Sequence, residues 1–180
     1  LFDKNGCSVQ GCDFRINDPV CNLVLSLSPT NNLCAGGGQA SIQSSITGGL
    51  GPFTYDWSDN RFDGNTQATG LSSGAFQLIV TDAQLCRDTA SVTLTDPLPL
   101  ETNCSIVNQP STVGGSDGRA RVVVRGGTGQ RNIQLSGPSP GQMQQSSVDT
   151  FTFSNLAAGR YTVRVSDANG CTDTCGFVLQ

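Results

Sequence analysis

The stretch Gly159-Arg-Tyr-Thr-Val-Arg-Val-Ser-Asp-Ala-Asn-Gly-Cys171 decides the fold of this chain. Tyr161, Val163 and Val165 alternate with polar residues, and a period of two is typical of a half-buried β-strand. The Asn-Gly pair that follows favours a tight turn, because both residues tolerate positive φ. The stretch therefore predicts a strand, a turn, and a cysteine that opens the next strand.

The same pattern occurs 85 residues earlier as Gly74-Ala-Phe-Gln-Leu-Ile-Val-Thr-Asp-Ala-Gln-Leu-Cys86, and in shortened form as Phe2-Asp-Lys-Asn-Gly-Cys7. The dipeptides Asp18-Pro19 and Asp96-Pro97 each follow an alternating segment, and proline ends a strand because it cannot donate to a sheet ladder. These landmarks predict that residues 1–18 are the terminal strand of a preceding repeat. Residues 19–97 would then form repeat one and residues 98–180 repeat two. The chain reads as a window cut from a longer tandem array.

The composition favours folded β structure. Only 13% of the 180 residues are charged, 22 are glycine, and we find no stretch of ten residues with a helical period. In repeat one, about seven short alternating segments are separated by a turn every 8–12 residues, which is typical of a β-sandwich. The sequence therefore predicts an all-β chain of tandem sandwiches.

Several functional classes are disfavoured. Ten cations against fourteen anions form no basic patch, which argues against nucleic acid, and no apolar run reaches the length of a membrane helix. Eight cysteines without any histidine favour disulfides in an oxidising compartment over zinc. An enzyme is not expected, since no histidine can activate a nucleophile and Glu101 is the only glutamate. Without an initial Met or a signal peptide, the sequence reads as a mature product or a fragment.

An ordered set of motifs resembles the SprB-type repeat of Bacteroidota gliding adhesins and giant surface proteins. The motifs are Pro52-Phe-Thr-Tyr-Asp-Trp57, Leu71-Ser-Ser-Gly-Ala-Phe76, Leu156-Ala-Ala-Gly-Arg-Tyr161 and Val165-Ser-Asp-Ala-Asn-Gly-Cys171. The resemblance implies Ig-like sandwiches, export to the bacterial cell surface, and tandem arrays in adhesive or fibrous proteins. It implies no enzyme activity. Repeat two departs from the pattern at Gly129-Gln-Arg131, and we expect Phe151 and Phe153 to refill its core.

Repeat position suggests disulfide partners. Apart from Cys21 beside the first linker, Cys34 and Cys86 are the cysteines of repeat one, so we expect them to join its two sheets. Thr112 stands where repeat two would have the equivalent of Cys34, which leaves Cys104 as the expected partner of Cys171. The remaining expected pair, across the first Asp-Pro linker, is Cys12–Cys21.

The other two cysteines are expected to pair outside the chain or in neighbouring copies. Cys7 would pair with an upstream equivalent of Cys104, and Cys175 with an equivalent of Cys21 beyond Gln180. Cys171 and Cys175 should not pair with each other, because their Cα atoms would stand about 13 Å apart in a straight strand. We expect residues 1–18 to add to a neighbouring copy by strand pairing, in a head-to-tail assembly.

Short motifs mark further candidate sites. The loop Asp59-Asn-Arg-Phe-Asp-Gly-Asn65 resembles a calcium loop, although Arg61 occupies a ligand position and no closing Glu follows. Asn103 begins a sequon, and Thr89 lies in an Asp-Thr-Ala motif similar to one used for O-glycans in Bacteroidota. We expect Asp82 and Asp167 to cap their turns through backbone hydrogen bonds.

Two functions fit these observations. The first is a structural component of an extracellular fibre or adhesin stalk, whose partners are neighbouring copies or adjacent repeats. The alternative is a carbohydrate-binding or adhesive module, in which Phe53, Tyr55 and Trp57 form an exposed face that holds surface glycans. A highly accessible Trp57 would favour the binding module, and a buried Trp57 with long inter-domain or inter-chain contacts would favour the stalk. The expected core is Trp57, Leu71, Phe76, Leu78 and Val80 in repeat one, and Leu135, Leu156, Tyr161, Val163 and Val165 in repeat two.

Overall fold

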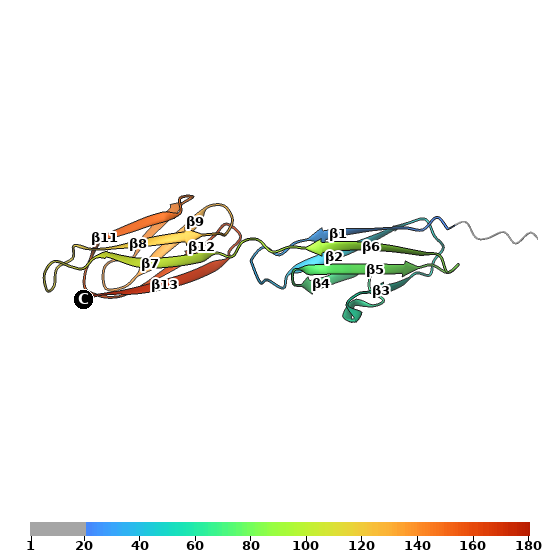
Figure 1. The fold of residues 1–180 in the computed structure, drawn as a ribbon, viewed down its shortest axis with the longest axis horizontal. Coiled ribbons are helices and arrows are strands. Elements are labelled where there is room, and N and C mark those ends of the chain that lie inside the picture. Colours follow the sequence, from blue (N-terminus) through green and yellow to red (C-terminus); the bar gives the residue numbers. More distant parts are fainter. Residues whose placement is uncertain (1–20) are drawn as a thin grey trace, which may run out of the picture.

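The computed structural model of the chain describes residues 21–180. Strands make up 56% of these residues, and their one helical element is the three-residue 3₁₀ turn Asn60–Phe62 (η1). Two β-sandwiches lie end to end, with most of their strands running close to the long axis of the molecule (Figure 1). The predicted all-β class is confirmed.

Sandwich one is built from six strands in two antiparallel sheets. One sheet has the order β1-β2-β4 and the other the order β3-β5-β6. The bounds of the strands are β1 Val24–Thr30, β2 Ala40–Thr47, β3 Thr54–Trp57, β4 Gln67–Leu71, β5 Gly74–Thr81 and β6 Arg87–Leu94. The sequence predicted about seven strands here, and the structure has six, with η1 in the loop between β3 and β4.

Sandwich two repeats this plan with one strand added. Its sheets have the orders β7-β8-β11 and β10-β9-β12-β13. The bounds are β7 Glu101–Asn108, β8 Gly118–Arg125, β9 Arg131–Ser136, β10 Gln142–Ser146, β11 Thr150–Leu156, β12 Gly159–Ser166 and β13 Thr172–Leu179. The additional strand β10 lies in the region where the repeat offset rises from 78 to 85 residues, so the inserted residues extend the β9 edge of the sheet.

The strand order is that of an immunoglobulin-like sandwich. In each sandwich the first, second and fifth Ig strands form one sheet, and the third, sixth and seventh form the other. Sandwich two also has the tyrosine corner of this fold. The Tyr161 hydroxyl donates to the carbonyl oxygen of Ala157 at 2.9 Å, just before β12. The LxxGxY motif therefore forms the corner between the fifth and sixth Ig strands.

Each sandwich has its own apolar core. All five core residues predicted for repeat two are buried, and Phe151 and Phe153 fill the same core as expected. In sandwich one Trp57, Leu71, Leu78 and Val80 are buried, whereas Phe76 is only half-buried and packs against the core from its margin. The predicted strand register is correct, since the polar partners of these residues point outward.

The first and last strands of each sandwich lie side by side and run in the same direction. In sandwich one these are β1 and β6, and in sandwich two β7 and β13. The backbone N–H of Leu25 in β1 donates to Asp88 in β6 at 2.7 Å, and that of Thr102 in β7 donates to Asp173 in β13 at 2.6 Å. In each sandwich, the first and last strands therefore start next to each other at one end of the sandwich.

Candidate functional site: the junction between the sandwiches

Asp167 holds together two turns at the end of sandwich two that faces sandwich one. Its Oδ1 accepts hydrogen bonds from the backbone N–H groups of Asn169 and Cys171, both at 2.9 Å, which closes the turn before β13. Its Oδ2 accepts from the N–H of Thr128 at 2.8 Å, in the turn that follows β8. The buried carboxylate therefore fixes the position of Cys171, and the predicted turn cap is confirmed.

Asp82 caps a turn in the same way at the end of sandwich one that lies away from the junction. It accepts from the N–H groups of Gln84 at 2.8 Å, Cys86 at 2.9 Å and Leu50 at 3.0 Å. Burial favours the neutral carboxyl, but the three backbone N–H groups outweigh it and hold the pKa of Asp82 below its usual range. The aspartate of the Val-x-Asp motif is thus a structural cap in both repeats.

The Gly-Gly pair of each repeat lets a neighbouring segment approach these caps closely. Gly126 and Gly127 both have positive φ, as do their counterparts in sandwich one. A Cβ atom on Gly126 would overlap the carbonyl oxygen of Pro99, and one on Gly127 would lie 2.7 Å from Leu100 Cδ1. The linker that enters sandwich two therefore packs directly against this glycine turn.

The loop after β1 forms the other side of the junction, and Asn32 organises it. The buried Asn32 accepts at Oδ1 from the N–H groups of Gln39 and Ala40, both at 2.8 Å. Its Nδ2 donates to Asp96 Oδ1 at 2.9 Å, and Gly36 N donates to Asp96 Oδ2 at 2.9 Å. These bonds attach the loop that carries Cys34 to the start of the linker.

The N–H of Gly36, followed by the amide of Asn32, lowers the pKa of Asp96 below its usual range. Asp96 therefore stays ionised over the neutral and mildly acidic range. Its Asp-Pro motif had indicated a strand end, but its role as a clamp on the Cys34 loop was not apparent. Nothing in the spacing between residues 32 and 96 signals that the two side chains meet.

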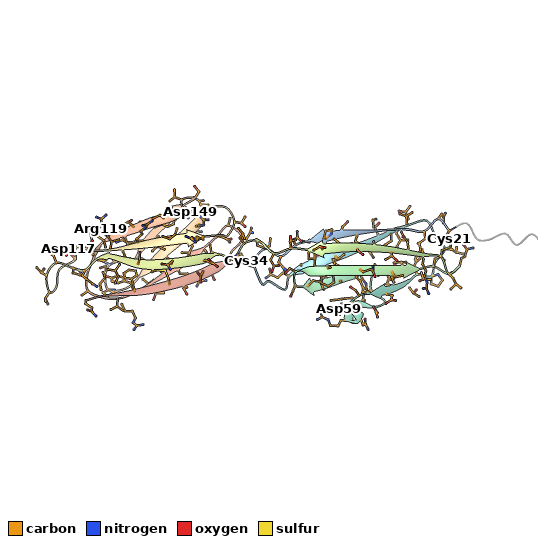
Figure 2. All side chains as sticks on the ribbon, in the orientation of Figure 1. Cys21, Cys34, Asp59, Asp117, Arg119 and Asp149 are labelled. Carbon is orange, nitrogen blue, oxygen red and sulfur yellow. A yellow bond between two sulfur atoms is a disulfide. The ribbon has the colours of Figure 1, made fainter. Side chains whose placement is uncertain are left out.

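A disulfide between Cys34 and Cys171 crosses the junction, with a Cα–Cα distance of 5.6 Å. Asn169 Nδ2 also donates to the carbonyl oxygen of Leu33 at 3.1 Å. Figure 2 shows Cys34 between the two sandwiches and Cys21 at the far end of sandwich one. The loop after β1 thus docks on the turn before β13.

The expected pair Cys34–Cys86 is wrong. Cys86 follows β5 and bonds Cys21 at the opposite end of sandwich one, with a Cα–Cα distance of 5.5 Å. Cys34 follows β1 and lies one strand length away. A strand of seven residues spans roughly 23 Å, far beyond the reach of a disulfide. The expected pair Cys12–Cys21 is also wrong, because Cys21 is bonded to Cys86.

The expected pair Cys104–Cys171 is also wrong. Cys104 in β7 bonds Cys175 in the adjacent β13, so Cys175 does not need a partner beyond Gln180. Cys171 lies four residues before Cys175, at the end of the sandwich rather than beside the middle of β7. Cys7 and Cys12, and the predicted strand pairing of residues 1–18, lie outside the described residues.

The candidate calcium loop uses its carboxylates within the loop. Asp59 caps η1 and pairs with Arg61 at 2.6 Å, while Asp63 Oδ1 accepts from the backbone N–H of Trp57 at 2.8 Å. Within residues 21–180, no three His, Cys, Asp or Glu side chains gather as a metal ion would require. The structure therefore does not bring these residues together as a ligand set.

The candidate glycosylation sites are both accessible. Thr89 is exposed on β6 and Asn103 is exposed on β7, next to the disulfide-bonded Cys104. Neither residue takes part in the junction. Their modification stays a prediction.

The proposed aromatic platform is not formed. Trp57 is 2% exposed, and its indole N–H donates to the carbonyl oxygen of Asn65 at 2.9 Å. Phe53 and Tyr55 are half-buried and pack against the same core. A buried Trp57 is not available to stack on a sugar ring. In the described part of the chain, no helix has the length and apolar character to cross a membrane.

Comparison with known proteins identifies one repeat family. The SprB repeat model matches residues 26–62, from β1 through η1. No curated protein matches the chain. Solved structures resemble it at low identity. The C-terminal 282-residue fragment of intimin, solved with the intimin-binding domain of the translocated intimin receptor, has 15% identity and a TM-score of 0.42, over 86% of this chain and 63% of that fragment.

Two further matches are to repeat modules. The fibronectin(III)-like modules of Clostridium thermocellum CbhA share 10% identity over 86% of this chain and 94% of theirs, with a TM-score of 0.32. A tetra-tandem repeat in the extending region of a large adhesion protein shares 16% identity over 88% of this chain and 49% of that one, with a TM-score of 0.31. This chain spans a little under two thirds of the intimin fragment, and its fold is assigned by its own strand order. Residues 26–62 match the SprB repeat, a surface-adhesin repeat, and the chain therefore carries an SprB repeat within its first sandwich.

Proposed function

We propose that this chain is a structural segment of an extracellular fibre or adhesin stalk, in which Ig-like repeats follow one another head to tail. The two repeat units would be residues 19–97 and 98–180, and residues 1–18 would end a preceding repeat. The observation that carries this proposal is the Cys34–Cys171 bond, because it joins the far end of one repeat to the near end of the next.

The shape of the described chain supports a spacer. Cys21 (Figure 2) and the C-terminus (Figure 1) lie at opposite ends of the described chain, so the two sandwiches add their lengths rather than folding back on each other. At the junction, hydrogen bonds of Asp96, Asn32 and Asn169 connect the linker, the loop and the turn. Such a junction fits an extended module in an oxidising, extracellular setting.

Electron microscopy of intact cells and of isolated native material tests this function. Antibodies raised against residues 21–180 should label extended structures outside the cell envelope, and these structures should contain copies in a regular axial order. A compact, soluble monomer confined within the cell, in which residues 1–18 fold back onto the same chain, would contradict the proposal.

A further inference from the structure

The three disulfides turn the described chain into two continuous covalent paths between its ends. The first path follows β1 from Cys21 to Cys34, crosses to Cys171, and follows β13 to Gln180. The second crosses from Cys21 to Cys86, follows β6 and the linker to Cys104, crosses to Cys175, and shares the end of β13. Neither path passes through the inner strands β2–β5 or β8–β12.

Both paths are short. The first contains 13 residue steps from Cys21 to Cys34 and nine from Cys171 to Gln180, which makes 22. The second contains 18 steps from Cys86 to Cys104 and five from Cys175 to Gln180, which makes 23. The backbone itself needs 159 steps between Cys21 and Gln180. The shortest covalent route between the ends thus contains less than one seventh of the residue steps of the backbone.

The residues on these paths are already extended. β1 and β13 provide most of the first path, and β6 with the first half of β7 provides most of the second. A strand rises about 3.3 Å per residue, against a limit of about 3.6 Å for a fully stretched chain. A pull along the long axis therefore finds little slack in either path, except in the short loops beside the disulfides.

We propose that the chain is a tension-bearing element whose load runs through these two paths while both cores stay folded. A pull at the ends of a chain without these bonds would peel or shear strands, since only hydrogen bonds and packing would resist it. Here the covalent bonds of β1, the Cys34–Cys171 disulfide and β13 carry the load directly. The biological use of this property rests on the proposed stalk function, whereas the property itself does not.

The two paths also protect each other across most of the molecule. The junction is crossed once by the Cys34–Cys171 disulfide and once by the linker between β6 and β7. Loss of either crossing leaves a path of nearly the same length. Within residues 21–180, only Cys21 and the final residues 175–180 belong to both paths.

Single-molecule stretching tests this inference on the full chain, held by peptide tags ligated to its two ends. The variants are Cys34→Ser/Cys171→Ser, which keeps the second path, Cys104→Ser/Cys175→Ser, which keeps the first, and the combined fourfold variant. Residues 1–20 are present in all of them and cancel in the comparison. Non-reducing peptide mapping confirms the remaining disulfides of each variant.

The wild type and both double variants should reach the same contour length within about 10 Å, because their shortest paths contain 22 or 23 steps. Of the three disulfides within residues 21–180, the fourfold variant keeps Cys21–Cys86, and its path must follow 94 steps from Cys86 to Gln180. Its contour length should exceed that of the wild type by roughly 250 Å, at about 3.6 Å for each added step. Contour length depends only on covalent connectivity, so this result holds even if the fourfold variant does not fold.

An unreduced wild type that lengthens by more than about 100 Å before rupture would overturn the inference. So would a Cys34→Ser/Cys171→Ser chain that lengthens as far as the fourfold variant. A wild type that resists stretching but is confined within the cell would contradict the stalk function and leave the tension paths intact. A surface fibre whose chains extend freely under load would contradict the tension paths and leave the stalk function intact.

Discussion

Cys34 and Cys171 are separated by 137 residues in the sequence, yet a disulfide joins them with their Cα atoms 5.6 Å apart. Cys34 belongs to the loop after the first strand of sandwich one, and Cys171 to the turn before the last strand of sandwich two. The linker crosses the same junction as backbone. Two covalent connections restrict bending and rotation between the sandwiches more than a single linker would.

Replacing Tyr161 by Phe should destabilise sandwich two by about 1–3 kcal/mol, measured by denaturant unfolding. The buried Tyr161 hydroxyl donates to Ala157 O and lies 2.7 Å from the Ser139 hydroxyl, which accepts from Ala157 N. Tyr161→Phe therefore leaves a carbonyl and a hydroxyl without this partner. Tyr55→Phe makes the same chemical change where no hydroxyl hydrogen bond is seen within residues 21–180, and it should cost less than about 0.5 kcal/mol. Equal costs for the two variants would contradict the tyrosine corner.

Replacing Gly127 by Ala should destabilise sandwich two more than replacing Gly170 by Ala. Both glycines have positive φ, so either alanine costs about 1–2 kcal/mol of backbone strain. A Cβ atom on Gly127 would also lie 2.7 Å from Leu100 Cδ1 and 3.2 Å from Asp167 Oδ2, whereas one on Gly170 meets nothing within 4 Å. Crowding should add about 1–3 kcal/mol for Gly127→Ala. Thermal unfolding that ranks Gly170→Ala as the more damaging change would contradict the packing of the linker on this turn.

Acid should weaken the caps and the junction of sandwich one. The folded-state pKa values of Asp82 and Asp96 lie below the ordinary value of 3.8. A lowered pKa means that the stabilisation is complete above the ordinary value and is lost as the pH falls through the lower folded-state value. The melting temperature should therefore fall steeply below about pH 4.

The matched control for this pH dependence is the variant Asp82→Asn/Asp96→Asn. It should melt at a lower temperature than the wild type at pH 7, because amides replace the ionised acceptors, and its melting temperature should change less between pH 4 and pH 2. If both proteins lose stability in parallel over that range, other carboxylates account for the acid sensitivity.

The fold was largely predictable because it depends on local patterns. Alternation at Tyr161, Val163 and Val165 identified the sixth Ig strand and its buried face, and Gly-Gly and Asp-x-x-Gly motifs identified the turns. Phe151 and Phe153 were recognised as replacements for the missing aromatic face. Each of these signals lies within one strand or one turn, so neighbouring residues decide it. Phe76 was placed too deep, since a position near the end of a sandwich can be half-covered without any change in the pattern.

The disulfide pairing was not predictable from repeat position alone. Cys34 and Cys86 belong to the same repeat, but one follows β1 and the other follows β5, so they lie at opposite ends of the sandwich. The direction of each strand contains the missing signal. Cys21 and Cys86 precede two strands that run in the same direction, and Cys34 follows the first of them. Strand direction therefore predicts the pair Cys21–Cys86 and places Cys34 at the end of the sandwich that faces the next repeat.

Non-reducing peptide mapping of the native protein tests the central claim most directly. The junction predicts a linked peptide pair that contains Cys34 and Cys171, together with the pairs Cys21–Cys86 and Cys104–Cys175. Partial reduction should release the Cys34 and Cys171 peptides together. Recovery of Cys34 linked to Cys86, with Cys171 linked to Cys104, would place both of these disulfides within one repeat and contradict a covalent junction between the sandwiches.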